Sequence, residues 1–134
     1  MHELVVRIRE PELCYVFAKN AIQRGHPELA LQAYRRAVDL RAESQGAETD
    51  AELAAYRAIY AYEEALGYRK GKRTRATGTW QMVKRLGLFE ALAKRINAGG
   101  DDDTPDILKD LGMEDYSFTA VREAFPDAFD KMAA

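Results

Sequence analysis

Hydrophobic residues recur three or four positions apart through much of the chain, which is the spacing of one face of a helix. In the segment 11–24 this apolar stripe consists of Leu13, Phe17, Ala18, Ala21 and Ile22. In the segment 27–45 it consists of Leu29, Ala30, Ala33, Ala37 and Leu40. A proline opens each segment and a glycine follows each, as expected at the two ends of a helix. The pattern predicts two helices joined by a tight turn.

Sequence signals also predict the ends of the helices that follow this pair. Thr49 and Glu52 have the spacing of a capping box, which predicts a third helix over about residues 50–68. Either Thr77 or Thr79 can cap a fourth helix over "WQMVKRL", and the glycine that follows ends it. The next run, "LFEALAKRIN", predicts a fifth helix.

The C-terminal third predicts two more short helices. One opens at Thr104 and Pro105, and the other covers "EDYSFTAVREAF". The Gly- and Asp-rich residues 98–104 are the best candidate for a flexible link before this helical pair.

The only strand-like run is "ELVVRIR" at residues 3–9, and one strand cannot form a sheet alone. It is either an extended arm or the start of a helix. We therefore predict an all-α protein, a compact bundle of six or seven short helices in one domain spanning residues 1–134.

Composition fits a soluble protein. The 134 residues are 47% hydrophobic and 31% charged, which is too apolar for general disorder. The longest uninterrupted apolar run, "LCYVFA", is far shorter than a membrane span, and the charged N-terminus is unlike a secretory signal. The single cysteine, Cys14, cannot form an internal disulfide. We expect a cytoplasmic protein with no membrane partner.

Charge is distributed unevenly although the formal net charge is only -2. Residues 69–97 carry nine Lys and Arg side chains against one acid, Glu90, whereas residues 98–134 carry ten acids against three bases. The densest part is "RKGKRTRATGTWQMVKR", residues 69–85, called the basic segment below. An outside polyanion, the acidic C-terminal third of the chain, or solvent must balance this charge.

The basic segment has the chemistry of a phosphate-binding surface, because it combines cations, hydroxyl donors and the amides of a helix N-terminus. We therefore expect a non-enzymatic protein that binds DNA or RNA through this segment. The candidate residues are Arg69, Lys70, Lys72, Arg73, Arg75, Thr77, Thr79, Lys84 and Arg85. Trp80 either stacks on an unpaired base or anchors its helix in the core. An acidic protein surface is the alternative partner.

Residues 79–97 resemble the helix-turn-helix of DNA-binding domains, with Gly87 in the turn. The apolar positions of that pattern are taken by Met82, Leu86, Leu88, Ala93 and Ile96. The resemblance implies a helical pair that contacts DNA. Residues 55–134 as a whole resemble small bacterial helical proteins that have a similar basic segment, and this resemblance implies no activity.

Residues 14–42 resemble one tetratricopeptide-type hairpin, on the spacing of Ala30, Tyr34 and Ala37. That family implies a protein-interaction or adaptor module. The third helix offers a surface for the same role, since Tyr side chains suit interfaces as well as half-buried core positions. The candidate partner-binding residues are Tyr56, Tyr60, Glu63 and Glu64. A homodimer is also left open.

The residues of catalytic chemistry are few. His2 stands near the terminus, His26 precedes a helix, and Cys14 lies among apolar neighbours, where a thiol is inert. No spacing of Cys and His suits zinc, and the Asp-rich run at residues 101–106 lacks the pattern of a calcium loop. We expect no enzymatic activity, no cofactor and no metal.

Overall fold

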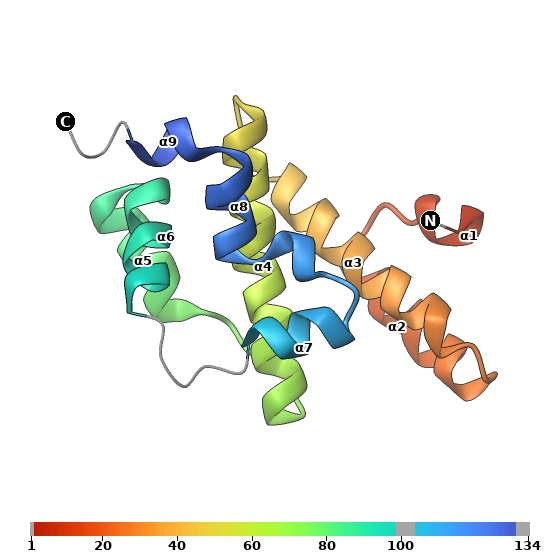
Figure 1. Cartoon of the computed structure of the whole chain (residues 1–134). Coiled ribbons are helices and arrows are strands. Elements are labelled where there is room, and N and C mark those ends of the chain that lie inside the picture. The colour runs from red at the N-terminus through yellow and green to blue at the C-terminus, as the bar shows by residue number, and fades with distance from the viewer. Residues whose placement is uncertain (1, 99–103, 131–134) are drawn as a thin grey trace.

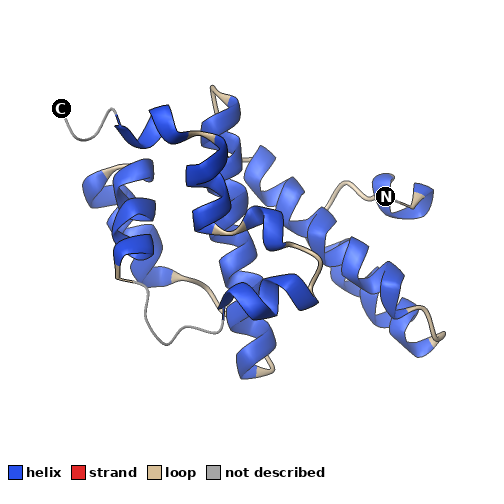
Figure 2. Cartoon of the chain, in the orientation of Figure 1, coloured by secondary structure: helices blue, strands red, loops and turns tan. Residues whose placement is uncertain are grey.

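The structure, a computed structural model, describes residues 2–98 and 104–130 and is all-α, as predicted (Figure 1). Within these residues seven helices have seven residues or more, and no strand is formed (Figure 2). The elements are α1 (Glu3–Val6), α2 (Pro11–Gln23), α3 (Pro27–Glu43), α4 (Asp50–Lys70), α5 (Thr77–Leu86), α6 (Leu88–Asn97), α7 (Thr104–Asp110), the 3₁₀ turn η1 (Glu114–Tyr116), α8 (Phe118–Ala124) and α9 (Pro126–Asp130).

The helix boundaries follow local sequence signals at α2, α3 and α4. Pro11 and Pro27 occupy the first turns of α2 and α3, where a missing amide costs nothing. Thr49 caps α4 by accepting a hydrogen bond from the amide of Glu52 at 3.1 Å. Gly71 ends α4 with a φ of 72°, a left-handed conformation that glycine adopts without strain.

The predicted cap of α5 is wrong. The N-cap is Ala76, and neither Thr77 nor Thr79 accepts a capping hydrogen bond. The amide of Ala76 instead donates to the carboxylate of Glu63 on α4, at 2.8 Å. A long-range acceptor thus satisfies an amide at the helix start, and only the folded structure brings it there.

The chain ends differ in detail from the expected elements. Residues 3–6 form the short helix α1, so the helical alternative for the N-terminal arm is correct. The single helix expected over "EDYSFTAVREAF" is split into η1 and α8. The split occurs at Ser117, whose hydroxyl caps α8 by accepting from the amide of Ala120 at 3.0 Å. Most of the candidate link at 98–104 lies outside the described residues.

Helices α2 and α3 form the predicted hairpin, with alanines between them. Buried residues at this contact are Cys14, Ala18, Ala21, Ala30, Ala33 and Ala37. Small side chains let the two helices approach closely. The predicted α3 stripe and the α2 residues Phe17, Ala18 and Ala21 lie at this contact, whereas Leu13 and Ile22 of the predicted α2 stripe are exposed, so that part of the prediction is wrong. Cys14 is fully buried, and burial raises the pKa of its thiol to about 11.

Helix α4 is the centre of the molecule and has a core on each side (Figure 1). One cluster joins α4 to α3, α7 and η1 through Val38, Tyr60, Leu108 and Met113 among others. The other joins α4 to α6, α8 and α9 around Ile59. Because both faces are covered, a single helix organises the elements that carry the basic segment.

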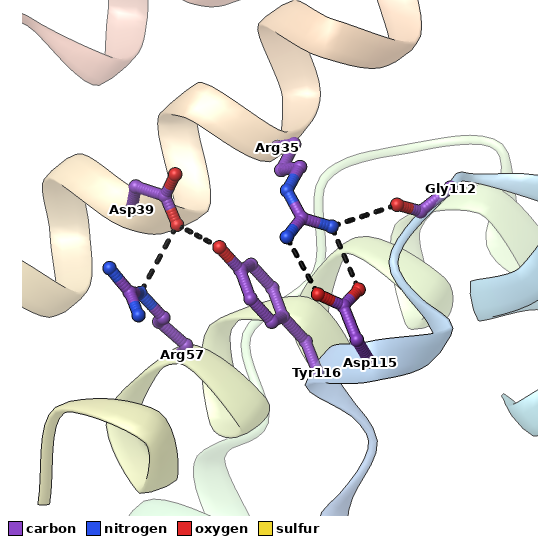
Figure 3. Close-up of polar contacts among 6 residues, drawn as sticks. All are labelled: Arg35, Asp39, Arg57, Gly112, Asp115 and Tyr116. Atoms are coloured by element: carbon purple, nitrogen blue, oxygen red, sulfur yellow. Dashed lines mark hydrogen bonds and ion pairs between the residues drawn. The ribbon is translucent and has the colours of Figure 1, made fainter. Parts of the chain in front are cut away.

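A polar clamp of five residues joins α3 and α4 to η1 (Figure 3). Its members are Arg35, Asp39, Arg57, Asp115 and Tyr116. Arg35 donates from both terminal nitrogens to the two oxygens of Asp115, at 2.8 and 2.7 Å. The central carbon of the Arg35 guanidinium group, Cζ, lies 4.2 Å from the centre of the Tyr116 ring. The Tyr116 hydroxyl donates to Asp39, and Arg57 forms an ion pair with the same Asp39 oxygen at 3.3 Å. Each charged side chain of the clamp therefore has an opposite charge beside it.

No helix in the described ranges is both long enough and apolar enough to cross a membrane.

Candidate functional site

The basic segment runs from the last turn of α4, through a loop at residues 71–76, to the end of α5 (Figure 1). Each Lys and Arg side chain predicted for the site is exposed. These residues are Arg69, Lys70, Lys72, Arg73, Arg75, Lys84 and Arg85. Exposure follows from the cost of removing so many like charges from water.

Two of these seven cations have partners. Arg73 forms an ion pair with Glu12 of α2 at 2.8 Å, and Arg69 donates to the Thr104 hydroxyl at 3.2 Å. Within residues 2–98 and 104–130, the other five form no ion pair. Those five are Lys70, Lys72, Arg75, Lys84 and Arg85.

The acidic C-terminal third does not pair with these five in the part of the chain that the structure describes. Asp115 forms an ion pair with Arg35 in the clamp. Asp106, Asp110 and Glu114 are exposed and form no ion pair with the five. Asp101 to Asp103, the other candidates for neutralising the segment, lie outside the described residues.

The cations fall into two groups. Residues 69–75 surround the loop at the C-terminal end of α4, whereas Lys84 and Arg85 occupy the last turn of α5. At about 1.5 Å of rise per residue, Lys84 lies about 10 Å along the helix axis from Thr77. The structure therefore brings together the loop group but keeps the second group at a distance.

The loop is held against α4 by Glu63. One oxygen of its carboxylate accepts from the amide of Ala76 and from the indole nitrogen of Trp80, each at 2.8 Å. The Trp80 ring packs on Tyr56 and Tyr60, with ring centres 6.4 and 5.1 Å apart. Trp80 is thus the core anchor of α5 rather than a free stacking platform.

The two predicted threonines differ. Thr77 is exposed at the start of α5. Thr79 is only 4% exposed, so its inclusion among phosphate-binding residues is not supported. Thr79, Val83 and Leu86 fall on one helix face, and this spacing is the sequence signal that identifies the inward side.

A pocket of about 530 Å³ opens beside the loop, and we call it the loop pocket. One face of α4 forms its floor, with residues at helical spacing: Tyr60, Glu63, Glu64, Gly67 and Tyr68. The remaining lining residues are Tyr15 of α2, Tyr34 and Arg41 of α3, residues 71–75 of the loop, and Leu111. A Cβ added at Gly67 would lie 3.2 Å from the carbonyl oxygen of Lys72, so glycine permits the loop to pack this closely on α4.

Glu64 is the half-buried acid of this pocket. It accepts a hydrogen bond from the Tyr15 hydroxyl, and burial raises the pKa of its carboxyl group above the ordinary value. Burial also raises the pKa of Tyr15, so its phenol remains a donor. Across the rim, the hydrogen bond from Arg73 lowers the pKa of Glu12.

The residues of the alternative interaction surface are mostly internal. Tyr60 is only 8% exposed, and Tyr56 is half-buried against Trp80, so the two rings do not form an exposed pair. Glu63 and Glu64 face the loop and its pocket. The tyrosine of α4 that does reach solvent is Tyr68, which is 60% exposed.

Sequence reasoning missed the contribution of α2 and α3 to this site. Glu12, Tyr15 and Arg41 lie far from the basic segment in the sequence, and 49 residues separate Tyr15 from its partner Glu64. No periodicity predicts such a meeting, because it depends on how the α2–α3 hairpin packs on α4.

Comparison with known proteins identifies no relative: no protein-family model, no curated protein and no solved structure matches the chain. In the described part of the chain, no group of three or more His, Cys, Asp or Glu side chains is arranged to hold a metal ion. The site is therefore interpreted from its own geometry and charge.

Proposed function

We propose that this protein binds nucleic acid, without catalysing a reaction, through contacts between the basic segment and phosphate groups. The observation that carries the proposal is that Lys70, Lys72, Arg75, Lys84 and Arg85 are exposed and form no ion pair in the described ranges. Cations left to solvent on one connected segment favour a polyanion, whose binding releases condensed counterions.

The arrangement favours a polymer over one small anion. The loop group and the pair Lys84 and Arg85 stand about 10 Å or more apart along α5, so one phosphate cannot contact both. A strand with several phosphates can span them. Thr77 is exposed in the first turn of α5 and can add a hydroxyl contact to a phosphate, whereas the Ala76 amide at the start of the helix is already bound by Glu63.

The test is a titration of labelled single-stranded and duplex oligonucleotides across a salt series, read by fluorescence anisotropy. We expect binding at about 50 mM salt, with a log–log slope of roughly -0.7 (single strand) to -0.9 (duplex) for each phosphate neutralised. The double variant Lys72→Ala, Arg75→Ala should weaken binding by about tenfold and flatten the slope.

The matched control is Lys19→Ala with Arg24→Ala. This change removes the same charge from exposed positions at α2, away from the basic segment. It should leave the slope unchanged. Absence of binding at low salt, or equal losses in the two double variants, would contradict the proposal.

A second candidate function is a protein-interaction module built on the α2–α3 hairpin. The observation that favours it is the exposed apolar side chains of Leu13 and Val16, one turn apart on α2. The variant Leu13→Ser, Val16→Ser separates this candidate from the first, because it should leave oligonucleotide binding intact.

A further inference from the structure

The loop pocket has features that phosphate contacts on the surface do not require. Its floor contains carboxylates and tyrosine rings, whereas its rim is cationic. A ligand that combines an anionic group with hydrogen-bond donors on an aromatic ring would match both parts of this lining. Volumes of about 300–1,000 Å³ are usual for pockets that enclose small ligands, and this pocket lies within that range.

The floor offers a free acceptor. One oxygen of Glu64 accepts from Tyr15, and its other oxygen, Oε2, has no hydrogen-bond partner among the described residues. Glu63 differs from Glu64 in that one of its oxygens already accepts two hydrogen bonds, from the Ala76 amide and the Trp80 indole. A carboxylate can accept through both oxygens at once, so Glu64 is suited to a ligand with two adjacent N–H groups.

The rim and walls supply the remaining contacts. Lys72 and Arg75 line the pocket without an ion pair in the described ranges, so both are available for a phosphate. The exposed ring of Tyr68 also lines the pocket and offers a face on which a planar base can stack.

We propose that the loop pocket binds one unpaired guanine nucleotide, with the N1–H and N2–H groups of the base donating to Glu64 and its phosphate on Lys72 and Arg75. The inference rests on the proposed function and identifies the part of the nucleic acid that enters the protein. Guanine presents two adjacent donors on its Watson–Crick edge, whereas adenine and cytosine each present one amino group beside an acceptor nitrogen. That acceptor would face the Glu64 carboxylate unpaired.

The test uses labelled oligothymidine strands of about ten nucleotides that differ only at one central position. The position holds guanine, inosine, adenine or an abasic site. Inosine keeps N1–H but lacks the N2 amino group. We expect the wild-type chain to bind the guanine strand about tenfold more tightly than the adenine or abasic strand, with inosine between them.

Two variants assign the preference to the pocket. Glu64→Gln keeps the size of the side chain but removes the paired acceptors, and it should reduce the guanine preference to within about twofold. Tyr68→Ala alters an exposed ring and should lower affinity for the strands that carry a base while leaving the abasic strand unaffected. Circular dichroism and thermal melting check that both variants fold.

The outcomes separate this inference from the proposed function. Equal binding of the guanine, adenine and abasic strands would overturn the guanine pocket and leave phosphate binding standing. No binding of any strand at low salt would overturn both. A further experiment adds free guanosine monophosphate as a competitor. Competition against the guanine strand in the wild type, but not in Glu64→Gln, would support binding of guanine in the loop pocket. Equal competition by adenosine monophosphate would contradict it.

Discussion

The polar clamp and the loop pocket bring together the same types of residue in opposite ways. Both contain Arg, Tyr and a carboxylate from distant parts of the chain. In the clamp each charge lies beside an opposite charge, and the hydrogen bond from Arg35 lowers the pKa of Asp115 (Figure 3). In the pocket, Lys72 and Arg75 have no ion pair within the described ranges, and burial raises the pKa of Glu64.

We infer from this difference that the clamp stabilises the fold, whereas the pocket is the region that we propose binds a ligand. Paired charges at the junction of α3, α4 and η1 hold the C-terminal third against the rest of the chain. Cations and acceptors without partners contribute little to folding, but they retain their capacity for a ligand. Variants that act on one region and spare the other test this distinction.

The largest expected effect comes from Arg35→Ala in the clamp. The change removes the paired hydrogen bonds to Asp115, the bond to the carbonyl of Gly112 and the contact with the Tyr116 ring. We expect the free energy of unfolding to fall by about 2–3 kcal/mol. Urea unfolding measures this loss, and Arg24→Ala, at an exposed site on the α2–α3 turn, is the control, expected within about 0.5 kcal/mol of wild type. An equal result for the two variants would show that the clamp is not stabilising.

The next effect is expected from Glu63→Ala, which removes the acceptor shared by Ala76 and Trp80. We expect a loss of about 1–3 kcal/mol, because the partly buried amide and indole N–H groups lose a charged acceptor. Trp80 fluorescence should shift toward that of an exposed indole before global unfolding. Unchanged fluorescence and stability would mean that Glu63 does not hold the loop.

A smaller effect on the free energy of unfolding is expected from Glu64→Gln, and this effect depends on pH. Burial raises the pKa of Glu64 above its ordinary value near 4.5, and Glu63 adds to the shift, while Tyr15, Arg41 and Arg73 oppose it. The folded state thus holds a proton that the unfolded state releases, so wild-type stability falls as pH rises through this range.

Removing this group should therefore stabilise the chain at neutral pH relative to wild type. The advantage should shrink as pH falls toward about 4.5 and be absent at lower pH, where the group is protonated in both the folded and the unfolded state. Asp115→Asn gives the opposite sign, since Arg35 lowers the pKa of Asp115 and its contribution is lost on acidification. Urea unfolding of the two variants between about pH 2 and pH 8 measures both trends, because the Asp115 contribution is lost only below its ordinary pKa of 3.8. Parallel curves would contradict the assignment.

The smallest effect on stability is expected from Lys72→Ala with Arg75→Ala. Both side chains are exposed, and neither forms an ion pair in the described ranges, so the free energy of unfolding should stay within about 0.5 kcal/mol of wild type. Oligonucleotide affinity should nevertheless fall. A large loss of stability would show that these cations have a structural role.

Local signals made the helices predictable. The two prolines and the Thr49 cap act through the backbone within a few residues, so the sequence is sufficient to find α2, α3 and the start of α4. Exposure of the basic segment was predictable in the same way, because burying so many unpaired cations is too costly.

Long-range polar contacts were not predictable. Arg35 and Asp115 are 80 residues apart, and neither stands out among the many charged residues of the chain. The loop pocket likewise needs Tyr15 and Arg41 from the hairpin, whose placement on α4 is decided by complementary packing of alanines and aromatic rings. The spacing of apolar residues in the sequence indicates which face of a helix is apolar, but not which other helix will cover that face.

The most direct test is an ¹⁵N–¹H NMR titration of the full chain with a single-stranded oligonucleotide of about ten nucleotides. We expect the largest shifts at the amides of residues 71–78, with smaller shifts near Tyr15. The amides of residues 112–116 in and beside the clamp should stay unchanged. Shifts concentrated at residues 112–116, with the loop unaffected, would contradict the assignment of a structural role to the clamp and of ligand contacts to the loop.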